Sequence, residues 1–112
     1  MKIAILTTDT SHHNYIVREL QPEFPIELVL DEQRSLKAPF ETSHPYEAQR
    51  DEYECQLFFG SKRLKLPAIA PTTLVDSVND QSSLALLRKA QPDIIIDIGT
   101  GKVSQEVIAL CP

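Results

Sequence analysis

The sequence has only three glycines, and none of them stands directly after its first apolar run. A dinucleotide-binding fold needs a glycine-rich turn at that point, so this class of site is disfavoured. The two cysteines, Cys55 and Cys111, have no metal-type spacing and no histidine motif nearby. A disulfide between them stays open, but free thiols and a cytoplasmic location are the better expectation.

Basic residues are also few, and the net charge is −5. The longest basic cluster is the short stretch 62–65, so DNA is not an expected partner, because phosphate binding needs clustered Lys and Arg. No apolar run approaches the roughly 20 residues of a membrane span. The remaining composition, with 42% apolar and 24% charged residues in 112, is that of a globular protein, and we expect one domain over 1–112.

Apolar runs of strand length alternate with helical patterns along the whole chain. The predicted strands are 2–6, 26–30, 73–78 and 93–98. The predicted helices are 11–21, 45–59, 81–91 and 103–110, with connections at 31–42 and 64–71. The predicted helix 45–59 is only weakly periodic. Its expected packing positions are Tyr46, Ala48, Tyr53, Cys55 and Phe59. Such alternation predicts an α/β fold, a Rossmann-like open parallel sheet of about four strands in the order 3-2-1-4 with helices on both faces.

The isoleucine-rich segment 93–98 is apolar on both faces of its expected strand. A strand of this kind normally has neighbours on both sides, yet the order 3-2-1-4 places it at an edge. We therefore expect either that the domain is truncated and further sequence completes the sheet, or that a second copy covers the edge by self-association. Asp97 interrupts this strand, and a capped or solvent-reaching carboxylate is the simpler expectation for it.

Two polar segments follow the first and fourth predicted strands, at the edge of the sheet where open α/β folds bind ligands. The later one contains Gly99, Thr100, Gly101, Lys102, Val103 and Ser104. It fits neither the dinucleotide nor the Walker phosphate pattern, although its two glycines allow a ligand to approach the backbone. A binding turn and a plain tight turn both stay open.

The earlier segment contains Thr8, Asp9, Thr10, Ser11, His12 and His13. Thr10 or Ser11 can cap the helix that follows, and the N-terminus of a helix attracts anions. Adjacent histidines on a helix point in different directions, so a shared metal is not expected. The alternative is a helix cap with two exposed imidazoles. No carboxylate pair, triad or metal cluster has persuasive spacing, so we expect no catalytic residue in the chain.

Three stretches in the same order resemble the folate-dependent formyltransferase family. They are Lys2-Ile3-Ala4-Ile5-Leu6, Ser77-Val78-Asn79-Asp80, and Pro92-Asp93-Ile94-Ile95-Ile96 leading into Gly99-Thr100-Gly101-Lys102-Val103-Ser104. The resemblance runs over all 112 residues, is strongest from Asp76 to Pro112 and is weak between Asp31 and Pro71. The family includes methionyl-tRNA formyltransferase, glycinamide ribonucleotide transformylase and the sugar N-formyltransferases.

The resemblance implies that the chain is the N-terminal half of a catalytic domain that moves a formyl group from 10-formyltetrahydrofolate to an amine. In the family the segment like Gly99 to Val103 lines the pterin pocket, and the segment like Thr8 to His13 faces the acceptor. Family catalysis uses an Asn-x-His motif and a later Asp, and the 112 residues contain no Asn-x-His sequence. The chain alone is therefore expected to be inactive.

The acceptor implied is a small molecule, preferably an amino sugar, because the segment 8–13 lacks the glycines of the phosphate loops in purine-pathway relatives. Two other classes stay open. One is a stand-alone α/β module, of the flavodoxin-like kind, that binds a small ligand or regulates. An acidic receiver site is disfavoured within this class, because Asp9 has no acidic neighbour in the sequence. The other is a nucleotide-dependent oxidoreductase, which the missing glycine pattern disfavours.

Overall fold

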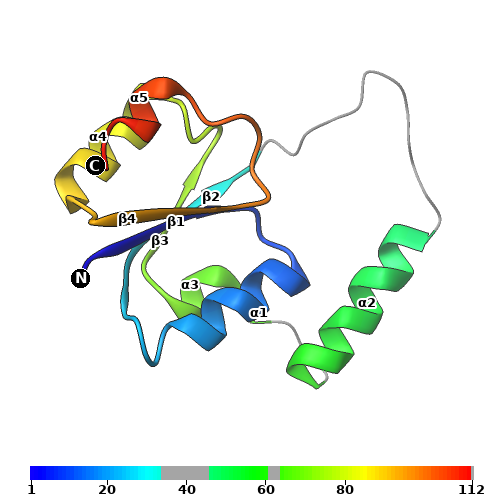
Figure 1. The fold of residues 1–112 in the computed structure, drawn as a ribbon. Coiled ribbons are helices and arrows are strands. Elements are labelled where there is room, and N and C mark those ends of the chain that lie inside the picture. Colours follow the sequence, from blue (N-terminus) through cyan, green and yellow to red (C-terminus); the bar gives the residue numbers. More distant parts are fainter. Residues whose placement is uncertain (34–45, 61–63, 112) are drawn as a thin grey trace.

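The fold is an α/β domain with one four-stranded, all-parallel sheet (Figure 1), seen in a computed structural model that describes residues 1–33, 46–60 and 64–111. The strand order is β3-β2-β1-β4, as the alternation of apolar runs predicts. The strands are β1 (Ile3–Thr7), β2 (Ile26–Glu32), β3 (Thr72–Val75) and β4 (Ile94–Ile98). The helices are α1 (Ser11–Leu20), α2 (Tyr46–Phe59), α3 (Leu66–Ile69), α4 (Gln81–Ala90) and α5 (Gln105–Ile108).

Helices cover both faces of the sheet, with α1 and α3 on one side and α4 and α5 on the other (Figure 1). Successive β1 residues alternate between the two layers, because side chains alternate across a strand. Ile3 and Ile5 pack toward α1 and α3, in a core of Ile3, Ile5, Val17, Ile26, Val29, Leu66 and Ala70. Ala4 and Leu6 pack toward α4 and α5, in a core of Ala4, Leu6, Leu30, Val75, Val78, Leu84, Leu87 and Val107. Both cores require the continuous apolar pattern of β1.

Local signals start and stop the two longer sheet-covering helices. Thr10 caps α1, and its hydroxyl accepts a hydrogen bond from the His13 backbone N–H. Helix α4 ends at Gln91, which has a left-handed backbone with φ +49°, and Pro92 follows it. Short-range signals in the sequence therefore determine where α1 begins and where α4 ends.

The structure corrects several predicted boundaries. Asp31 and Glu32, assigned to a connection, are the last two residues of β2, because they pair with Leu74 and Val75 of β3. The predicted loop 64–71 contains the short helix α3, whose Leu66 is fully buried. The rest of the predicted connection, residues 34–42, lies outside the described part of the chain.

Helix α2 packs chiefly on α1 rather than on the sheet, and it stands to one side of the domain in Figure 1. Tyr15 stacks on Phe58 with ring centroids 4.4 Å apart, and the Arg18 guanidinium lies over the Phe59 ring.

Tyr53, predicted to pack inside, is instead 65% exposed, since its position on α2 faces away from α1. Side chains of Tyr46 and Ala48 lie outside the described set, and Cys55 and Phe59 are half-buried.

Strand β4 forms one edge of the sheet, with β1 as its neighbour on the inner side. Ile94 is 40% exposed, and Ile95, Ile96 and Ile98 are only half-buried. Among the described residues, no strand covers the outer edge of this apolar segment. A search of the same residues for a helix with the length and apolarity to cross a membrane finds none.

Candidate functional site

The segments after β1 and β4 meet at the carboxyl edge of the sheet. The Thr7 hydroxyl donates to the Ile98 carbonyl over 2.9 Å, which ties the two strand ends together. One residue further along, the His13 imidazole lies directly against the backbone of Gly99. A Cβ at that glycine would stand only 2.3 Å from His13 Cε1, so no side chain fits there. The structure thus brings the two segments singled out by sequence side by side.

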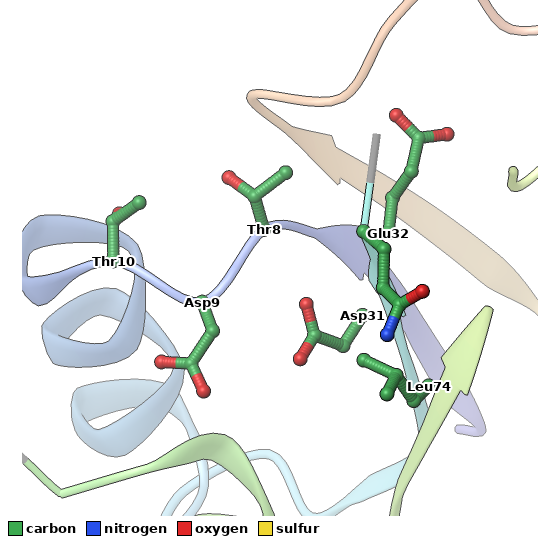
Figure 2. A pocket seen from close by; sticks show the side chains of 7 residues that line it. Thr8, Asp9, Thr10, Asp31, Glu32 and Leu74 are labelled. Carbon is green, nitrogen blue, oxygen red and sulfur yellow. The ribbon is translucent and has the colours of Figure 1, made fainter. Parts of the chain in front are cut away.

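A cavity of about 550 Å³ opens beside this contact, at the ends of β1, β2 and β3. Its lining residues are Thr8, Asp9, Thr10, Asp31, Glu32, Gln33 and Leu74. Figure 2 shows the carboxylates of Asp9 and Asp31 facing each other across it, with Thr8 and Thr10 along one wall. Among the described residues, the lining of this cavity contains three acidic residues and no basic one, which favours a cationic or hydroxyl-rich ligand over a phosphate.

Ser11 and His12, the next two residues of the same segment, are directed at helix α2 instead. The Ser11 hydroxyl donates to Asp51 Oδ1 over 2.9 Å, and the same carboxylate lies 3.4 Å from the Ser11 backbone N–H. His12 Nδ1 lies 3.0 Å from Glu54 Oε2. The Ser11 N–H at the N-terminus of α1 is therefore engaged by the Asp51 carboxylate of the protein itself, where an external anion would otherwise bind.

His13 is nearly buried and is oriented by Thr8. Its Nδ1 lies 3.1 Å from the Thr8 carbonyl oxygen and 3.0 Å from the Thr8 hydroxyl oxygen. Because a carbonyl can only accept, Nδ1 carries the proton. Burial lowers the pKa of His13 below its ordinary value of 6.5, and the neighbouring His12 lowers it further, against the opposing effects of the Thr8 carbonyl and Glu54. The ring is therefore neutral near pH 7, and it serves as a spacer between the two segments.

The segment after β4 is held by hydrogen bonds to its backbone. Glu32 Oε1 accepts from the Gly101 N–H over 3.1 Å, and Asn79 Oδ1 accepts from the Ser104 N–H over 2.8 Å. Asp97 accepts from the Thr100 hydroxyl over 2.5 Å, as expected for a capped carboxylate. Since protein oxygens engage these backbone donors, the segment is a shaped wall rather than a phosphate cradle.

A second cavity of about 240 Å³ lies between β1, β4 and α5. Its lining is apolar except for one carboxylate, and consists of Leu6, Ile95, Asp97, Val103, Val107 and Ile108. Val103 is the member of the predicted binding segment that reaches this cavity. Gly99, Thr100, Gly101 and Lys102 are not in its lining, and their contribution is the path of the backbone that brings Val103 there.

Sequence reasoning missed three residues of this region: Asp31, Glu32 and Asn79. The two acidic residues fall in the predicted connection 31–42, and Asn79 directly follows the predicted strand 73–78. Asn79 instead joins the end of β3 to the β4 segment, since its amide also donates to the Lys102 carbonyl over 2.8 Å. The available signal was position, because polar residues at the ends of adjacent parallel strands converge on one edge.

No family model matches this chain, and no curated protein matches it either. Within the described ranges, no group of three or more His, Cys, Asp or Glu side chains is placed to hold a metal ion. Cys55 and Cys111 are free thiols.

Proposed function

We propose that the carboxyl edge of this sheet is the ligand-binding half of a folate-dependent formyltransferase site. The formyl donor would be 10-formyltetrahydrofolate and the acceptor a small amine, such as an amino sugar. The observation that supports the proposal most is the pair of unlike cavities, acidic and apolar, formed by the two segments expected to face acceptor and donor.

The acidic cavity suits the acceptor. Carboxylates of Asp9 and Asp31 can accept hydrogen bonds from an ammonium or from sugar hydroxyls. Because an amine attacks only in its neutral form, a nearby carboxylate can also receive the proton that it loses. Because the lining formed by residues 8–10, 31–33 and 74 holds three acidic side chains and no basic one, it disfavours an acceptor whose phosphate must enter this cavity.

The apolar cavity suits a flat heterocycle such as a pterin. Its side chains, among them Leu6, Ile95 and Val103, offer contact to ring faces, and Asp97 offers an acceptor for ring N–H groups. The chain supplies binding surfaces in this proposal, whereas the donors that would stabilise the developing oxyanion are not among its residues. We therefore expect the 112-residue chain to bind without turnover.

The test is a titration of the chain with 5-formyltetrahydrofolate, a stable reduced folate, followed by amide NMR. Saturable shifts at Val103 and Val107 are expected, with none for NADH at the same concentrations. Shifts with NADH alone would favour the oxidoreductase reading, and shifts with neither ligand would end the folate proposal. Formyl transfer from 10-formyltetrahydrofolate to an amino sugar above a buffer control would contradict the expected lack of turnover.

The outer edge of β4 supports self-association as a further part of this proposal. Its sequence, Ile94-Ile95-Ile96-Asp97-Ile98, has high strand propensity and carries no proline or lysine to block pairing. A second copy could add its own β4 to this edge. Sedimentation should show a concentration-dependent dimer that Ile94→Lys abolishes and that Leu57→Lys, on exposed α2, leaves intact. A monomer at all concentrations would contradict this expectation.

A further inference from the structure

Glu32 joins two segments that are distant in sequence and separated in the sheet. Its side chain is 6% exposed, and Oε2 accepts from the Val78 N–H over 2.9 Å while Oε1 accepts from the Gly101 N–H. Val78 follows β3, whereas Gly101 follows β4, and β1 lies between β2 and β4. The β4 segment must therefore cross the end of β1 to reach Glu32, whose carboxylate points toward β4 in Figure 2.

Asn79 makes a second attachment one and three residues further along the same segment, at Lys102 and Ser104. Its amide nitrogen donates to the Lys102 carbonyl and its amide oxygen accepts from the Ser104 N–H, each over 2.8 Å. Ser104 in turn caps α5, because its hydroxyl accepts from the Val107 N–H. The positions of Val103 and Val107 in the apolar cavity therefore depend on the hydrogen bonds that Asn79 makes.

We infer that Glu32 and Asn79 are positioning residues that hold residues 100–104 in the shape that forms the apolar cavity. Hydrogen bonds to a buried carboxylate are stronger than those between neutral groups, and they hold the backbone without using a side chain of the segment. Glu32 also lines the acidic cavity, so one residue borders one ligand space while it shapes the other. The identity of the ligand rests on the proposed function, but the positioning role does not.

Two near-isosteric variants test the attachments through Glu32 and Asn79 one at a time. Glu32→Gln keeps the shape but replaces one accepting oxygen with a donor that must face a backbone N–H. Asn79→Asp keeps the acceptor for Ser104 but sets an oxygen against the Lys102 carbonyl. Glu27→Gln is the matched control, since Glu27 lies on the same strand and is exposed.

Amide hydrogen exchange provides the structural readout. We expect exchange at Gly101 to rise roughly tenfold in Glu32→Gln, as for the loss of one charge-assisted hydrogen bond. Exchange at Ser104 should rise in Asn79→Asp, and neither amide should change in the control. In the unaltered chain, NMR scalar couplings across the two hydrogen bonds should link the amide nitrogens of Val78 and Gly101 to the Glu32 carboxyl carbon, because one carboxylate accepts from both. These couplings need no variant, so they decide the role of Glu32 even if Glu32→Gln does not fold.

Binding provides the functional readout. Both variants should weaken the binding of 5-formyltetrahydrofolate by roughly tenfold, the same free energy as the exchange effect. Unchanged exchange at Gly101 and Ser104, or the absence of couplings from Val78 and Gly101 to the Glu32 carboxyl carbon, would overturn the inference. If the unaltered chain binds no folate while the exchange effects appear, the proposed function fails and the positioning role stands.

Discussion

The segments after β1 and β4 lie side by side at one edge of the sheet, yet they present different chemistry. Residues 8–10 keep polar side chains toward an open acidic cavity. Residues 99–104 instead have their backbone engaged by Glu32, Asn79 and Asp97, and they present Val103 to an apolar cavity. A segment that binds through its side chains can be recognised from its own composition. The role of a segment that acts through the path of its backbone cannot, because that path depends on residues elsewhere in the sequence.

The contact between His13 and Gly99 joins the two segments, so disrupting it should have the largest effect. Gly99 has φ +77°, and a Cβ there would collide with the His13 ring. Gly99→Ala should lower the free energy of unfolding by about 2–5 kcal/mol, combining left-handed backbone strain with overpacking. Urea denaturation measures this loss.

Gly60 supplies the matched control for Gly99. It has φ +84°, and no atom of the described residues beyond its chain neighbours lies within 4 Å of the added Cβ, so Gly60→Ala should cost only the backbone strain of about 1–2 kcal/mol. In a His13→Ala background, the cost of Gly99→Ala should fall to that level. Equal costs for Gly99→Ala and Gly60→Ala in the unaltered background would show that the ring contact does not constrain the segment.

Ser11 tests how far the binding role of residues 8–13 extends. Ser11→Ala removes the hydrogen bond to Asp51 and should lower the free energy of unfolding by about 1 kcal/mol, without changing ligand binding. Thr8→Val, at the cavity wall, should instead weaken binding of an amine such as glucosamine. If Ser11→Ala weakened that binding as much as Thr8→Val, Ser11 would belong to the ligand site.

The pH dependence of stability should show the smallest effect. The pKa of His13 is lowered by burial, so the unfolded chain takes up a proton on this ring that the folded chain resists. Stability is therefore retained above about pH 6.5 and declines as the pH falls from there toward the lowered value. His13→Asn keeps a donor near the Thr8 carbonyl and should reduce this slope in urea denaturation between pH 7.5 and pH 5.5. An unchanged slope would show that His13 does not contribute to it.

Much of the fold could be predicted, because its signals are local. The apolar runs around Ile5, Val29 and Ile96 mark strands, and Thr10 and Pro92 mark helix boundaries. The extension of β2 through Glu32 could not be predicted, because it depends on pairing with β3, more than 40 residues away. An Asp-Glu pair followed by further polar residues resembles a connection until that pairing is known.

The location of the candidate site could be predicted from the sequence, but the contacts of its residues could not. Polar residues after the first and fourth strands had to meet at one edge, and they do. The partners of Ser11, His12 and Asn79 lie 40, 42 and 23 to 25 residues away in the sequence, so short-range patterns assign them to caps. Their geometry depends on where α2 and the β4 segment settle, which local propensity does not determine.

The attachment of α2 through α1, rather than through the sheet, has a consequence for local unfolding. An element that shares little of the main apolar core separates at a lower free energy than the strands do. When α2 separates, Ser11 and His12 lose the carboxylates of Asp51 and Glu54 together, and the Ser11 N–H loses its partner. Local separation of α2 would therefore expose these two side chains of α1 to water while the sheet and its two cores stay intact.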